Sequence, residues 1–263
     1  LNATNSTVTN AVATNLSSGT VNATIGITTA TLKLTSMNIA LGNNAAQSSQ
    51  GLYAVAIGYQ AGQTAQGTNT VAIGNNAGNI SQGSSAVAVG INAGNTSQGS
   101  QAVALGMQAG QTAQGSNTVA IGINAGNTSQ GSHAVAIGPN AGVTSQGSQA
   151  VALGMQAGQT AQGTNTVAIG INAGNTSQGS QAVALGMQAG QTAQGSQAVA
   201  LGVNAGNTSQ GSNAIAIGNA AGQTNQHANS IILNATGSQF NSGITGAFYV
   251  NPVRNVSQTN VLG

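Results

Sequence analysis

Few residues of this chain could carry out acid–base or metal chemistry. Among its 263 residues there is no Asp, Glu, Cys or Trp, and the charged side chains are Lys33 and Arg254. The two histidines, His133 and His227, lie far apart in the sequence. General acid–base catalysis requires titratable groups held close together, and metal sites require thiolates, carboxylates or clustered imidazoles. We therefore predict that the protein is not an enzyme, and that it has no catalytic residues, no cofactor and no metal site.

The same composition excludes two classes of partner. Tight binding to nucleic acid needs several Lys or Arg contacts with phosphate groups, and a formal net charge of +2 does not supply them. No apolar run approaches the roughly 18 residues of a membrane span, so we predict no membrane insertion in this segment. The chain starts at Leu1 and shows no signal-peptide pattern, so we expect a mature or trimmed part of a longer protein.

An internal repeat organises most of the chain and must position whatever surface it presents. The dipeptide Gln-Gly recurs every 16 residues from Gln50-Gly51 to Gln210-Gly211. With Gly51 as column 1, the unit is G-x-x-A-V-A-I-G-x-N-A-G-x-T-S-Q, and twelve units fill residues 35–226 without an insertion. This period is too short for helical-pair repeats of about 33 residues or propeller blades of about 40. It fits one coil of a parallel β-solenoid, so we predict an all-β fold.

Columns 4 to 7 are predicted to form the first strand of each coil, because small and large residues alternate there with the period of a strand. A second, more polar strand is predicted over columns 12 to 16. Since this second strand supplies few bulky side chains, we predict that Val and Ile fill the interior and that Ala lines an outer face. The opposite orientation stays open, because the alternation alone does not say which side faces inward. The predicted core is represented by Val55, Ile57, Val71, Ile73, Val119, Ile121, Val167 and Ile169.

Two columns are expected to hold the coils in register. Column 8 is always Gly, which predicts a turn that needs a positive φ angle or a close approach between coils. Column 16 is always Gln, and stacked amides can hydrogen-bond along the solenoid axis. The predicted turn glycines are Gly58, Gly74, Gly90, Gly106, Gly122, Gly138, Gly154, Gly170, Gly186, Gly202 and Gly218. The predicted ladder consists of Gln66, Gln82, Gln98, Gln114, Gln130, Gln146, Gln162, Gln178, Gln194 and Gln210.

The unit also resembles a known repeat. Residues 132–138, S-H-A-V-A-I-G, are similar to the repeat of the YadA-like head domains of trimeric autotransporter adhesins, and the resemblance covers residues 35–226. It implies a left-handed parallel β-roll in which three chains form an obligate homotrimer. The even spacing, the near absence of charge and the C-terminal sequence are closest in style to the versions in fibre proteins of phages and large DNA viruses.

The two ends differ from the repeat. Residues 1–34 contain two similar stretches of 11 residues rich in Thr, Val and Ile, which favours a β-rich shaft or N-terminal connector. Residues 35–226 form the predicted twelve-coil head. Residues 227–263 are predicted to form a decayed coil followed by a C-terminal connector.

These features predict a structural and adhesive segment of a trimeric surface fibre, which is a rigid rod that presents or carries a binding end. We expect it to be extracellular, on a virion fibre or a cell surface. Its expected partners are further copies of itself and a receptor or glycan on a host surface. The alternative is an ice-binding β-solenoid, because Thr nearly fills column 14. A single Thr column and a long apolar face, which normally marks association, count against that alternative.

Overall fold

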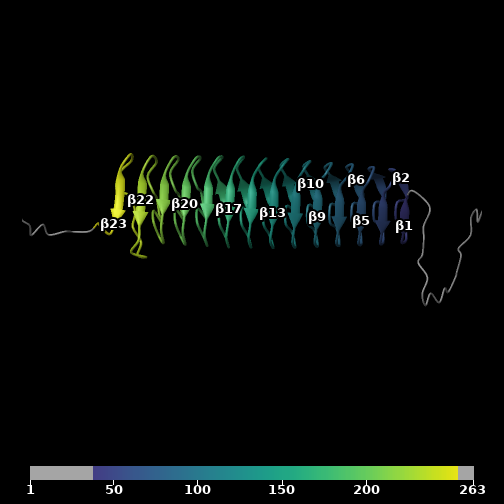
Figure 1. Cartoon of the computed structure of the whole chain (residues 1–263), viewed down its shortest axis with the longest axis horizontal. Coiled ribbons are helices and arrows are strands. Elements are labelled where there is room, and N and C mark those ends of the chain that lie inside the picture. Colours follow the sequence, from purple (N-terminus) through teal and green to yellow (C-terminus); the bar gives the residue numbers. More distant parts are fainter. Residues whose placement is uncertain (1–37, 254–263) are drawn as a thin grey trace, which may run out of the picture. The chain divides into compact units, whose positions relative to one another are not determined.

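The structure, a computed structural model, describes residues 38–253. The predicted shaft at 1–34 and the last part of the predicted C-terminal connector, 254–263, lie outside the described residues, as do Lys33 and Arg254. The described part is all-β and forms a parallel β-solenoid with 16-residue coils stacked in one row (Figure 1), which confirms the predicted fold class. No helix among residues 38–253 is long and apolar enough to cross a membrane.

Sheet A is formed by the first strand of each coil and has 14 parallel strands. These strands are β1 (Ile39–Leu41), β3 (Val55–Ile57), β5 (Val71–Ile73), β7 (Val87–Val89), β9 (Val103–Leu105), β11 (Val119–Ile121), β13 (Val135–Ile137), β15 (Val151–Leu153), β17 (Val167–Ile169), β19 (Val183–Leu185), β20 (Val199–Leu201), β21 (Ile215–Ile217), β22 (Ile231–Asn234) and β23 (Phe248–Asn251). Equivalent columns pair, so that Val119 lies between Val103 and Val135. Through β21 each strand therefore covers columns 5 to 7, one residue fewer than predicted.

Sheet B is formed by the second strand of each coil and has nine parallel strands. These strands are β2 (Ser48–Gln50), β4 (Thr64–Gln66), β6 (Ile80–Gln82), β8 (Thr96–Gln98), β10 (Thr112–Gln114), β12 (Thr128–Gln130), β14 (Thr144–Gln146), β16 (Thr160–Gln162) and β18 (Thr176–Gln178). They cover columns 14 to 16 only. The predicted start at column 12 is wrong because the glycine there, with φ of +54° at Gly126, belongs to the preceding turn.

The middle residue of each sheet B strand has left-handed backbone geometry. In β12 this residue is Ser129, with φ of +58°, and only its neighbours Thr128 and Gln130 pair with the next strand. In a regular strand, residues two apart point to the same side. The left-handed residue between them instead sends Thr128 toward solvent and Gln130, which is 2% exposed, into the coil.

Alanine lines the interior of the roll, which corrects the predicted core. Ala residues of columns 4, 6 and 11, such as Ala134, Ala120 and Ala125, are fully buried. The residues predicted as core lie on the outer side of sheet A, half-buried or exposed: Val55, Ile57, Val71, Ile73, Val119, Ile121, Val167 and Ile169. The reason is space. The Gln of column 16 reaches across the coil, and its carboxamide leaves room for methyl groups but not for Val or Ile side chains.

Larger residues close the C-terminal end of the roll. Ile232 of β22 takes the interior position that Ala216 has in β21, and it is fully buried. The loop 235–247 then brings Phe240 against Tyr249 of β23, with ring centroids 6.3 Å apart and an interplanar angle of 82°. The backbone of this loop continues the stack, because Gly222 donates a hydrogen bond to the carbonyl of Phe240.

Candidate interaction surface

The Gln side chains of column 16 connect the two sheets inside each coil. Gln114 Nε2 donates to the carbonyl of Val103, 3.0 Å away in sheet A of the same coil, and to Gln130 Oε1 of the next coil at 3.2 Å. At other steps the second hydrogen bond goes instead to an Ala carbonyl, as from Gln98 to Ala102 at 3.2 Å. The predicted amide ladder is thus one part of a network that also ties sheet B to sheet A.

Amide-to-amide bonds of 3.1–3.3 Å join seven successive pairs of this column: Gln50–Gln66, Gln66–Gln82, Gln114–Gln130, Gln162–Gln178, Gln178–Gln194, Gln194–Gln210 and Gln210–Gln226. At the steps to Gln98 and Gln146, the donor turns to an Ala carbonyl instead, from Gln82 to Ala86 and from Gln130 to Ala134. The Gln residues of this column from Gln66 to Gln226 are each 2% exposed, so every member of the predicted ladder lies inside the roll.

Glycine has a different physical role in columns 8 and 12. The predicted turn glycines, from Gly58 to Gly218, all have φ between +108° and +131°. A Cβ at Gly122 would also lie 2.9 Å from the carbonyl of Gly138 in the next coil. At Gly126, in column 12, a Cβ would lie 2.7 Å from Gln130 Oε1. Column 12 therefore leaves the space that the buried carboxamide occupies.

A second amide ladder, in column 13, was missed by the sequence analysis. Asn127 Nδ2 donates to the carbonyl of Gln108 at 3.0 Å and to Gln111 Oε1 at 3.1 Å, both in the preceding coil. Asn175 makes the same two bonds, to Gln156 and Gln159. The signal was available: column 13 holds only Asn or Gln from Gln47 to Gln223, except for Val143.

The outer side of sheet A, together with the turn that follows it, forms what we call the apolar face. It consists of the Val, Ile and Leu residues of columns 5 and 7 and the large apolar residues of column 9. Leu153 of column 7 is 41% exposed, and Met107 and Ile123 of column 9 are 44% and 49% exposed. Because the same columns stack in every coil, these side chains form a continuous stripe along sheet A.

The outer side of sheet B is polar. It presents the Thr residues of column 14, and between them the Ser or Ala residues of column 15. This polar face carries no formal charge, because Lys33 and Arg254 lie outside the described residues. The two outer faces of one coil therefore differ sharply in polarity.

The histidines are not brought together. His133 lies in the column 3 turn with φ of +61°, and His227 lies six coils further on, where its Nδ1 is 3.0 Å from Ser242 Oγ. Residues 38–253 contain no group of three His, Cys, Asp or Glu side chains that could hold a metal ion. The stacked geometry supports association between surfaces far better than it supports bond-making chemistry.

Comparison with known families agrees with the resemblance of the unit. Three segments, 49–77, 129–157 and 161–189, match the family model of the YadA head domain repeat (2 copies). Searches of the curated proteins and of the solved structures gave no significant match. The chain thus contains YadA head repeats, as the sequence predicted, whereas the similarity to phage and viral fibres stays a prediction.

Proposed function

We propose that this chain is a structural and adhesive segment of a trimeric surface fibre, in which three copies pack through their apolar faces. The observation that carries the proposal is the continuous stripe of Val, Ile, Leu and Met side chains that sheet A turns outward. Burial of apolar surface contributes about 25 cal/mol per Å², and soluble monomers rarely expose a contiguous stripe of this kind. The corrected orientation matters here, because Val and Ile, rather than Ala, are the residues available for packing between chains.

The mechanical role follows from the stacking. Each coil is hydrogen-bonded to the next through both sheets, through the turns and through two amide columns. The 14 strands of sheet A, about 4.8 Å apart, give a rod of roughly 60 Å. Such a rod holds a binding end away from its base without any catalytic step, and we place it outside the cell because the YadA head repeats are adhesin repeats.

The partner at a host surface would meet the polar face and the turns, since the apolar face is used between chains. These surfaces offer hydroxyl and amide groups, so recognition of a receptor or glycan would rest on neutral hydrogen bonds. Ice binding gains no support from the family match, and sheet B presents a single Thr column rather than paired Thr columns.

Mass in solution tests the proposal. The protein should have the mass of three chains by light scattering or sedimentation equilibrium at micromolar concentration, and its stability should fall with protomer concentration. Ile121→Lys places a charge on the apolar face and should abolish the trimer. Thr128→Lys, on the polar face of the same coil, is the matched control and should leave the trimer intact. A well-folded wild-type monomer would refute the proposal.

A further inference from the structure

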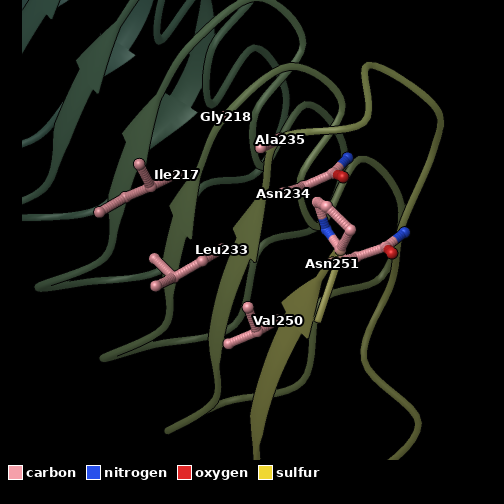
Figure 2. Close-up of a pocket in the computed structure, with 8 residues that line it drawn as sticks. Ile217, Gly218, Leu233, Asn234, Ala235, Val250 and Asn251 are labelled. Carbon is pink, nitrogen blue, oxygen red and sulfur yellow. The ribbon is translucent and has the colours of Figure 1, made fainter. Parts of the chain in front are cut away.

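The apolar face ends in a hollow of about 490 Å³ at the C-terminal end of the roll. Its wall is built from the column 7 residues Ile217, Leu233 and Val250, one from each of β21, β22 and β23. Figure 2 shows these three side chains pointing to the same side of the sheet, on successive strands. Ala235 and Pro252 line the hollow at the adjacent turn.

The hollow exists because column 9 changes its residue type. Further up the roll this column holds large apolar side chains, such as Met187, which is 45% exposed, and Val203, which is 37% exposed. The next two residues of the column are Asn219 and Ala235. The single methyl group of Ala235 does not fill the volume that Met or Ile fills elsewhere, so the side chains of column 7 are left uncovered.

A projecting aromatic side chain lies at the other end of the same strand. Phe248 occupies the column 5 position of β23, beside Ile231, and is 65% exposed. Its neighbour Tyr249 points inward against Phe240, so the alternation of the strand turns Phe248 to the outer side. Phe248 does not line the hollow of its own chain. The C-terminal end thus carries a large apolar side chain without a pocket and an apolar pocket without an occupant.

We propose that Phe248 of one protomer fills this hollow in the neighbouring protomer, which closes a ring of three chains at the base of the roll. The inference rests on the proposed trimer. Rotation about an axis parallel to the roll keeps every residue at its own height, and Phe248 and the hollow both belong to the last coils. The start of β23 in one copy then meets the turn after β23 in the next, which is a head-to-tail contact that closes on itself. Buried aromatic side chains in apolar pockets are frequent energetic centres of interfaces.

Disulfide trapping tests the contact, because the chain has no native cysteine. A tagged Phe248→Cys chain and an untagged Ala235→Cys chain are co-expressed, assembled and oxidised. We expect a covalent pair of one tagged and one untagged chain, and no such pair when either variant is expressed alone. If the mass is that of a trimer but no mixed pair forms, the trimer stands and this contact is refuted. If the protein is a monomer, both proposals fail.

Two substitutions give an independent measurement. Phe248→Ala should raise the dissociation constant of the trimer about tenfold or more, as expected for the loss of an interface anchor. Ile244→Ala is the control, because Ile244 is similarly exposed, at 64%, but lies in the loop between β22 and β23. Ala235→Met restores the side chain that column 9 has elsewhere and should weaken the trimer by occupying the hollow. Equal dissociation constants for all three variants and the wild type would overturn the inference.

Discussion

At the scale of single residues, the interior of the roll depends on a few small groups that make room for one long side chain. Gln114 donates to the backbone of the opposite sheet and to the next coil, and the neighbouring Ala residues leave space for its carboxamide. A buried amide without partners would cost about 1–3 kcal/mol, so the position rewards Gln and excludes longer aliphatic neighbours. The glycine of column 12 belongs to the same arrangement, because its missing Cβ makes room for the oxygen of the amide.

The glycines of column 8 allow a direct test. Gly122 has φ of +126°, and any Cβ at this position would lie 2.9 Å from the backbone of the next coil. Gly122→Val should therefore lower the free energy of unfolding by more than about 1 kcal/mol per chain, measured by chemical or thermal denaturation, and the effect is repeated three times in the proposed trimer.

The control for this test is Asn117→Ser in column 3. Asn117 has φ of +59°, and Ser85 has φ of +58° in the same column, so Ser fits this geometry. We expect a change within about 0.5 kcal/mol, as for most surface substitutions. If Gly122→Val unfolds at the same denaturant concentration as the wild type, the glycine of column 8 is not required by the turn.

At the scale of elements, each coil is two short strands joined by turns that need left-handed residues. Asn117, Asn124 and Ser129 represent columns 3, 10 and 15, which have φ near +57° in successive coils. Left-handed geometry is costly for most residues and least so for Gly, Asn and Asp. This requirement accounts for much of the Asn, Ser and Gly content of the chain, and it keeps the strands at three residues each.

The repeat predicts how the roll responds to a change of length. Deletion of residues 163–178 removes one complete unit and leaves every column stacked on its equivalent. The variant should keep the β-sheet circular dichroism spectrum and a cooperative melting transition.

Deletion of residues 163–177 is the matched control, because it removes one residue fewer. It shifts every later column by one position, which reverses the inward and outward sides of each strand. This variant should lose cooperative melting. Equal behaviour of the two deletions would contradict a roll in which columns stack in register.

At the scale of the whole molecule, the roll is a stack held together by hydrogen bonds and apolar contacts rather than by charge. The chain contains no Asp or Glu, and both of its Lys and Arg residues lie outside the described residues. Stability depends on pH only through groups whose protonation differs between the folded and unfolded states. The molecule therefore has very little proton linkage through which pH could act.

The expected result is a melting temperature that stays nearly constant from about pH 3 to about pH 9, because almost no group changes its proton affinity on folding. Addition of a chelator should also leave it unchanged, since metal-dependent folds lose stability when the metal is removed. Calorimetry at several pH values, with and without chelator, measures both effects. A steep loss of stability in acid would contradict this account of the fold.

The sequence by itself determined the architecture, because a strict 16-residue period with fixed glycines admits a stack of coils and little else. Residues such as Gly122 and Gln114 could be placed in a turn and in a stacked column from their spacing alone. The side on which Val119 and Ala120 lie could not be placed, since an alternation of large and small residues is the same whichever side faces inward. Tertiary structure decided it: the left-handed residue of column 15 turns Gln130 into the coil, and the narrow space that remains accepts alanine but not valine.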